Sequence, residues 1–135
     1  MTASVIADTH TVLWYLSADP RLSVRARQAM EAATSLGQPI YVPTICIVET
    51  TYLTEKNRVG PEALVRLRYA ILGPGASFDP VSLTVEIALA LASIPRSVVP
   101  DLPDRVIAAT ALALRLPLVT CDSKIQELSS IQTIW

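Results

Sequence analysis

The segment that decides the fold is residues 4–16, which read SVIADTHTVLWYL. Its first four residues, Ser4 to Ala7, form a short apolar run rich in β-branched side chains, which predicts a buried strand. Residues 9–16 carry apolar side chains at helical spacing and predict a helix. Asp8 lies between the two, so a carboxylate directly follows the end of a strand.

The rest of the chain continues this alternation of strands and helices. Further strands are predicted at residues 40–42, 76–79, 117–121 and 131–134. Further helices are predicted at residues 23–33, 45–56, 60–72, 83–94, 104–114 and 122–128. Thr44 is the expected N-cap of the helix that begins at Ile45. Alternation of this kind favours a parallel sheet with helices on both faces, so we predict one α/β domain over residues 1–135.

Composition limits the class of protein. The chain has 135 residues, of which 51% are hydrophobic, enough to bury a full core. Charged residues make up only 17%, against about 25% in an average domain, so we expect some apolar surface to meet a partner. No apolar run reaches the roughly 18 residues of a membrane span, and no Lys or Arg precedes Arg21 as in a secretory signal. We therefore expect a soluble protein without membrane contact, located in the cytoplasm.

Cysteine and charge usage give two further expectations. Cys46 and Cys121 belong to no CxxC pair and have apolar neighbours, so we expect buried, reduced thiols. The net charge of −1 argues against a protein that holds nucleic acid by bulk electrostatics. That argument weakens if several of the twelve acidic residues lie in an internal pocket. Two groups of arginines are then candidates to contact RNA phosphates, or else form solvated helix faces. They are Arg21, Arg25 and Arg27, and Arg66 and Arg68.

Two aspartates directly follow predicted strands. Asp8 comes after residues 4–7, and Asp122 comes after residues 117–121. The carboxyl ends of parallel strands meet at one crevice, where ligands bind, so both side chains are expected there. The alternative for each is a structural role as a helix N-cap.

Glu49 is predicted to lie on an apolar face of its helix. Its neighbours one turn away are Ile45, Cys46, Tyr52 and Leu53, which form a stripe expected to face the core. An unpaired charge in that position would be costly to desolvate, so Glu49 needs a partner. The alternative to a pocket is a buried salt bridge with an arginine.

Asp101 and Asp104 lie one helical turn apart. They share a face at the start of the predicted helix, where both benefit from the helix dipole. The structural alternative is that Asp101 is the N-cap and Asp104 an acidic residue in the first turn.

Carboxylates that converge would repel one another and shift toward protonation unless a cation neutralises them. The candidate metal ligands are Asp8, Glu49, Asp104 and Asp122. All are hard oxygen ligands, and the chain has one histidine and no paired thiols, which favours one or two Mg²⁺ or Mn²⁺ ions over zinc or iron. Such a site suits phosphoryl-transfer chemistry, so a nuclease is the leading class.

Four segments of the chain, in order, resemble the motif regions of PIN-domain proteins. They are Ala7 to Leu16, Pro43 to Glu49, Asp101 to Ala111 and Leu118 to Asp122. The likeness spans the chain and is strongest to VapC-type toxins of toxin–antitoxin pairs, in the Asp-Thr-His opening followed by Leu-Trp-Tyr-Leu. It implies a PIN-like α/β/α sandwich with a central parallel sheet of about five strands. It also implies a Mg²⁺- or Mn²⁺-dependent endoribonuclease that cleaves RNA with metal-activated water.

The resemblance also assigns roles by position. Asp8, Glu49 and Asp104 match the three most dependable acidic positions, and Asp122 matches a fourth. Thr9 and Thr120 match hydroxyl positions that orient carboxylates or water, and Asp101 matches an accessory acid whose contact with the metal is open. The implied partners are an RNA substrate, a cognate antitoxin of VapB-like or Phd-like type, and a second copy in a homodimer.

Several alternatives stay open or are excluded. A haloacid-dehalogenase-like phosphatase needs a second aspartate where this chain has His10, and a receiver domain needs paired acids near the first strand. A PIN scaffold that binds RNA or protein without cutting remains the alternative to a nuclease. His10 is expected to pack or hydrogen-bond near the pocket rather than act in catalysis, and Arg105 to contact RNA or an antitoxin.

Overall fold

The computed structural model describes residues 3–135 and has a five-stranded parallel sheet at its centre. The strands are β1 (Val5–Ala7), β2 (Ile40–Pro43), β3 (Phe78–Val81), β4 (Leu118–Val119) and β5 (Thr133–Ile134). Their order across the sheet is β3-β2-β1-β4-β5, and every neighbouring pair is parallel. The predicted parallel α/β sheet is therefore confirmed.

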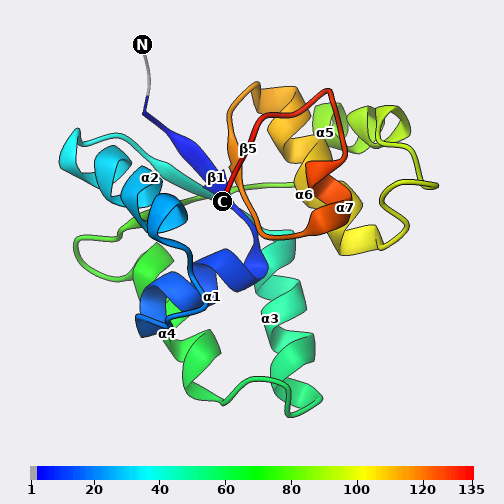
Figure 1. Cartoon of the computed structure of the whole chain (residues 1–135). Helices are drawn as coiled ribbons and strands as arrows, with labels where there is room; N and C mark the ends of the chain where they lie inside the picture. The colour runs from blue at the N-terminus through cyan, green and yellow to red at the C-terminus, as the bar shows by residue number, and fades with distance from the viewer. Residues whose placement is uncertain (1–2) are drawn as a thin grey trace.

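Helices cover both faces of this sheet. They are α1 (Thr9–Ser17), α2 (Val24–Ser35), α3 (Ile45–Glu55), α4 (Glu62–Leu72), α5 (Val85–Ala90), α6 (Leu102–Leu114), α7 (Ser123–Gln126) and the 3₁₀ helix η1 (Leu91–Ser93). Figure 1 shows α1, α2 and α4 on one side and α5, α6 and α7 on the other. The result is the expected α/β/α sandwich. Across residues 3–135, every helix is too short or too polar to cross a membrane.

The core lies on both sides of the central strand. All three residues of β1 are buried, because helices cover both of its faces. Among the largest fully buried side chains are Met30 from α2, Phe78 from β3 and Ile107 from α6. The apolar run in residues 4–7 is thus explained by a strand that reaches no solvent on either face.

Element boundaries differ from the predictions where proline or glycine acts. The third strand begins at Phe78, two residues later than expected, after Gly75 adopts a φ of +66°. It runs through Pro80, which an edge strand tolerates because it need not donate every backbone hydrogen bond. The sixth helix begins at Leu102 rather than Asp104, because Pro103 suits the first turn, where backbone N–H groups have no helical partner.

Two further helix predictions need correction. Thr44 occupies the predicted N-cap position of α3, but it has helical backbone angles and its side chain accepts no capping hydrogen bond. The helix predicted over residues 83–94 is shorter: Thr84 caps α5, which ends at Ala90 and tightens into η1 before Pro95.

The carboxyl ends of β1 and β4 are adjacent, because these strands pair directly. The helix α3 contacts both α1 and α6, which brings the starts of these two helices near the same edge of the sheet. Carboxylates on these elements therefore meet at one place.

Candidate active site

Asp8 has both roles that were considered for it: it caps a helix, and its carboxylate lies at the shared edge of the sheet. Its carboxylate caps α1 by accepting a hydrogen bond from the Thr11 N–H at 3.0 Å, and it accepts another from the Thr120 hydroxyl. The residue is only 8% exposed, and this burial raises the pKa of its carboxyl group above the usual value. The hydrogen bonds from Thr11 and Thr120 act in the opposite direction, because they favour the ionised form.

Glu49 reaches the same region from α3. It is half-buried, and its carboxylate accepts a hydrogen bond from the Thr9 hydroxyl at the start of α1. The alternative of a salt bridge with an arginine is wrong, since Arg21–Asp19 is the only ion pair within residues 3–135. The predicted core-facing stripe needs correction too: one of its members, Tyr52, is exposed, so Glu49 lies at the margin of the core.

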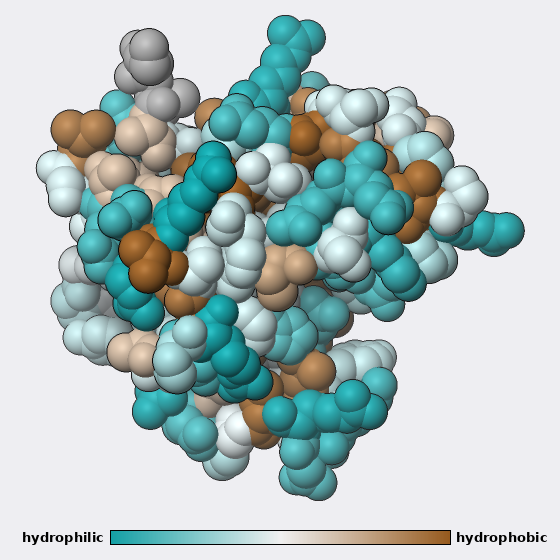
Figure 2. Space-filling model, in the orientation of Figure 1, coloured by the Kyte–Doolittle hydropathy of each residue, from teal (hydrophilic) through white to brown (hydrophobic). Residues whose placement is uncertain are grey.

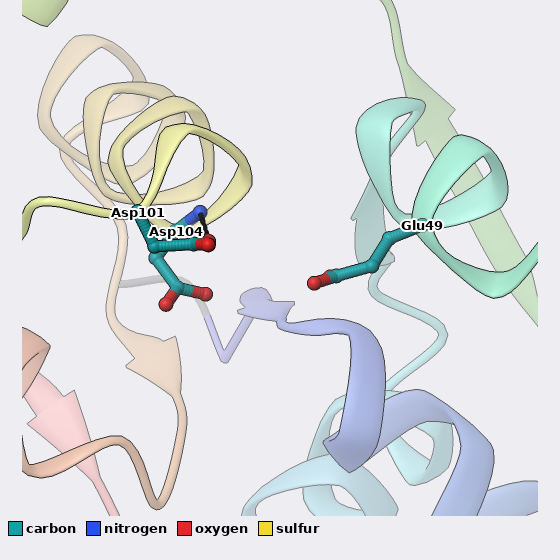
Figure 3. Close-up of side chains that lie close together, drawn as sticks. All are labelled: Glu49, Asp101 and Asp104. Atoms are coloured by element: carbon teal, nitrogen blue, oxygen red, sulfur yellow. Dashed lines mark hydrogen bonds between the residues drawn. The ribbon is translucent and has the colours of Figure 1, made fainter. Parts of the chain in front are cut away.

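Asp101 and Asp104 present carboxylates at the start of α6. Asp101 is the N-cap, and its carboxylate accepts a hydrogen bond from the Asp104 N–H at 3.1 Å. Carboxylate oxygens of Glu49, Asp101 and Asp104 all lie within 4.8 Å of one another, a spacing that could hold a metal ion. Figure 3 shows Glu49 pointing from α3 toward this pair.

Asp122 is linked to Asp8 through one hydroxyl group. The Asp122 carboxylate caps α7 by accepting hydrogen bonds from the N–H groups of Lys124 and Ile125, each at 2.9 Å. The Asp122 N–H donates to the Thr120 oxygen at 3.0 Å, and the same hydroxyl donates to Asp8. Thr120 is fully buried and thus fixes the two strand-end aspartates relative to each other.

These side chains line one small cavity, called here the acidic cavity, of about 90 Å³. Its lining consists of Asp8, Thr9, His10, Glu49, Asp104, Ile107, Cys121 and Asp122. The four acids predicted from the sequence as metal ligands are therefore brought together. Asp101 lies beside the cavity, against Glu49 and Asp104, and Thr120 lies behind it, against Asp8.

Asp104 is the acid most affected by this crowding. Burial, and then the negative charges of Asp101, Asp122, Glu49 and Asp8, raise the pKa of Asp104 to about 7. A carboxylate in such a place is stabilised in its ionised form by a bound cation. All of the crowded groups are carboxylates, the ligands that Mg²⁺ and Mn²⁺ prefer, so the residues present fit a divalent metal ion of this kind.

Comparison with known proteins identifies the family. The family model of the PIN domain matches residues 5–130. This chain belongs to the PIN domain family. Its sequence is 28% identical over 123 residues to Ribonuclease VapC22 of Mycobacterium tuberculosis, a match that covers 91% of this chain and 90% of that protein.

Solved structures share the PIN-domain fold at low sequence identity. A chain of VapBC2 from Rickettsia felis, bound to a DNA fragment from its promoter, matches with a TM-score of 0.72 and 13% identity over 96% of both chains. A chain of DNA-bound VapBC from Salmonella typhimurium also matches with a TM-score of 0.72, at 18% identity over 98% of this chain and 97% of that one.

Two residues of this PIN domain, Arg105 and Cys121, lie elsewhere than expected. Arg105, expected to contact RNA or an antitoxin, has its guanidinium engaged within the chain: it donates to the carbonyl oxygens of Leu91 and Ile94, at 2.8–3.2 Å, and so fixes the end of η1 against α6. Cys46 is buried as expected, but Cys121 is exposed and lines the acidic cavity. The polar neighbours of Cys121, Thr120 and Asp122, were the sequence signal that this thiol is exposed.

Proposed function

We propose that this PIN-domain chain is a metal-dependent endoribonuclease and the toxin of a toxin–antitoxin pair. The observation that carries the proposal is the convergence of Asp8, Glu49, Asp104 and Asp122 on one cavity. Asp8 and Asp122 also cap helices, but the convergence of all four acids raises the pKa of Asp104 and weakens the fold at neutral pH, which helix capping does not require. The likeness to a protein named a ribonuclease supports RNA as the substrate.

The four acids are the proposed metal ligands and catalytic residues, for one or two Mg²⁺ or Mn²⁺ ions. Glu49 and Asp104 have the strongest support, since their carboxylate oxygens lie within 4.8 Å of each other. Asp101 shares that spacing and is proposed to assist, while it also caps α6.

The chain's own residues orient these acids for the reaction. Bound in the acidic cavity, the metal ion would act as a Lewis acid, which would polarise the scissile phosphate and lower the pKa of an attacking water. The Thr120 hydroxyl holds the Asp8 carboxylate, and the Thr9 hydroxyl holds that of Glu49. The hydrogen bond from Thr120 favours the ionised form of Asp8, the form that binds a cation. The cap by Asp101 fixes Asp104 in the first turn of α6.

A partner protein is supported by the apolar surface and by the structural neighbours, which are VapBC complexes. Exposed apolar side chains gather on α3 and α4, among them Val48, Tyr52, Val65, Tyr69 and Leu72. We propose that a VapB-like or Phd-like antitoxin and a second copy of the chain cover apolar surface of this kind. The proposed site of action is the cytoplasm, where the RNA substrate is found.

A cleavage assay on the purified protein tests the enzymatic part. RNA should be cut with Mg²⁺ or Mn²⁺ and left intact with EDTA. Asp8→Asn should remove activity, because asparagine keeps a capping oxygen but loses the charge, while Asp79→Asn at an exposed position of β3 serves as the control. Equal activity in EDTA would contradict the proposal, and no cleavage with any metal would favour a scaffold that binds without cutting.

Expression in a bacterial host tests the toxin role separately. The chain alone should arrest growth, and co-expression of an antitoxin encoded next to it should restore growth. Harmless expression of a protein that cleaves RNA in the purified state would count against the toxin role while leaving the ribonuclease intact.

A further inference from the structure

A second cavity adjoins the acidic cavity, and we call it the arginine cavity. Its volume is about 310 Å³, and it lies between α1 and the start of α4. Its lining includes His10, Trp14, Arg21, Arg58, Glu62 and Arg66. His10, which is exposed, also lines the acidic cavity, so the two cavities share this residue.

The arginine cavity carries positive charge in a chain whose net charge is −1. Three guanidinium groups, from Arg21, Arg58 and Arg66, face two carboxylates, from Asp19 and Glu62. In Figure 2, the surface over α1, α4 and the α3–α4 connection is mainly hydrophilic, with a small hydrophobic area between the hydrophilic atoms. The positive charge of the arginine cavity can therefore attract an anion, although the carboxylates of the neighbouring acidic cavity would repel it.

Two of these arginines are available to a ligand. Arg58 and Arg66 are exposed, and the guanidinium group of neither forms a hydrogen bond or ion pair with any residue in the range 3–135. Their guanidinium groups can therefore bind a phosphate without first breaking an internal contact.

The third arginine is held in a fixed orientation. The Arg21 guanidinium donates to the Asp19 carboxylate at 2.8 and 3.0 Å, and its central carbon lies 5.0 Å from the centre of the Trp14 ring. The Arg21 side chain is nevertheless 67% exposed. It thus offers solvent a flat, preorganised surface, of the kind on which unpaired bases stack.

A flat stacking surface beside two unpaired guanidinium groups matches one ligand better than others, namely a nucleotide. We propose that the arginine cavity binds a nucleotide of single-stranded RNA next to the phosphodiester in the acidic cavity. The base stacks on Arg21, and the phosphate contacts Arg58 and Arg66. The inference rests on the proposed function for its choice of RNA. His10 lies where the RNA strand would pass from one cavity to the other.

The fold separates arginines that are close in sequence, and this supplies a matched control. Arg66 and Arg68 are both exposed and lie two residues apart on α4. Arg66 lines the arginine cavity, whereas Arg68 lines an apolar groove next to α3. Replacement of either changes the net charge equally, so only the position differs.

Binding is measured by fluorescence anisotropy with a short, labelled, single-stranded RNA of mixed sequence, in EDTA to prevent turnover. Arg58→Ala and Arg66→Ala should each weaken binding roughly threefold to tenfold, and each should lower the salt slope by about 0.7. Glu62→Gln should tighten binding, because it removes a negative charge from the cavity. Arg68→Ala should leave affinity close to that of the wild type.

Cleavage kinetics with Mg²⁺ separate binding from chemistry. The Arg58 and Arg66 variants should raise KM and change kcat little, since these residues act on the substrate away from the acidic cavity. Arg66→Lys keeps the charge and should restore most of the lost affinity. Thermal melting confirms that the variants are folded.

The outcomes distinguish this inference from the proposed function. If the wild type cleaves RNA, and the Arg58 and Arg66 variants bind and cleave as it does, the inference is wrong and the ribonuclease stands. Loss of antitoxin binding with unchanged RNA binding would assign the cavity to a protein and also overturn it. RNA binding that depends on Arg58 and Arg66 without cleavage under any metal would uphold the inference and refute the ribonuclease.

Discussion

Thr120 shows how one hydroxyl group can organise two acids. It donates to Asp8 and accepts from the Asp122 N–H, all within a buried environment. Thr120→Val should destabilise the protein by about 1–3 kcal/mol, because it leaves polar groups of both aspartates without partners. Urea denaturation measures this loss.

The matched variant at the same position is Thr120→Ser, which keeps the hydroxyl and removes only a methyl group. It should retain most of the RNA cleavage that Thr120→Val loses. Equal cleavage by both variants would show that the hydroxyl does not orient the acids.

Asp101 has a capping role and a proposed metal role that two substitutions can separate. Asn is as good an N-cap as Asp, so Asp101→Asn should keep the stability of the wild type. It should still weaken Mg²⁺ binding, because it removes one of three carboxylates that lie within 4.8 Å. Asp101→Ala should in addition lose about 0.5–2 kcal/mol of stability. Calorimetric titration with Mg²⁺ and urea denaturation measure the two effects; unchanged Mg²⁺ affinity in Asp101→Asn would leave Asp101 as a cap alone.

Sequence reasoning located residues whose position follows from local order. Asp8 directly follows β1 and Asp122 comes soon after the end of β4, so the shared edge of a parallel sheet was enough to place them together. The orientation of Arg105 could not be predicted from local order, because its partners, the carbonyl oxygens of Ile94 and Leu91, lie eleven and fourteen residues away in the sequence. The partner of Glu49, the Thr9 hydroxyl, is separated from it by forty residues.

At the scale of the elements, Arg105 connects α6 to the end of η1. Arg105→Ala should lower the free energy of unfolding by about 1–3 kcal/mol, since it removes charged hydrogen bonds to the carbonyl oxygens of Leu91 and Ile94. Arg96→Ala, at an exposed position near the same turn, is the control. Urea denaturation gives the free energies. A loss of RNA affinity with unchanged stability would restore the earlier expectation that Arg105 contacts a ligand.

The type of most elements followed from hydrophobic periodicity, while their ends did not. Apolar spacing predicted the five strands and the seven α-helices of residues 3–135 but not η1, and Gly75 and Pro103 moved the starts of β3 and α6. The effect of proline depends on tertiary position: Pro80 is accepted in β3 because that strand is at the edge of the sheet. An edge cannot be recognised without the strand order, which periodicity does not contain.

For the molecule as a whole, the distribution of charge matters more than its sum. The net charge of −1 counted against nucleic-acid binding, yet acids and arginines are concentrated in two adjoining cavities. The sequence suggested the first of these groups, from strand ends and helix faces. It named Arg21 and Arg66 in separate groups as candidates to contact phosphates, but it did not bring them together with Arg58, because the three come from separate segments.

The acidic cavity should also make the stability of the whole protein depend on pH and metal together. The pKa of Asp104 is about 7 in the folded protein and 3.8 in its ordinary state. Because the folded state holds this proton more tightly, it gains stability at low pH and loses it as pH rises through that range. In EDTA, the melting temperature should therefore fall between about pH 4 and about pH 7 more steeply than that of Asp104→Asn.

Mg²⁺ should reverse this loss, because a cation binds the ionised acids and stabilises the folded state by mass action. The rise in melting temperature on adding Mg²⁺ should be small near pH 5 and larger near pH 8, where Asp104 is ionised. Asp104→Asn should show a smaller rise at the higher pH, and Asp79→Asn a rise like that of the wild type. A rise of equal size at both pH values would mean that Asp104 does not take part in holding the ion.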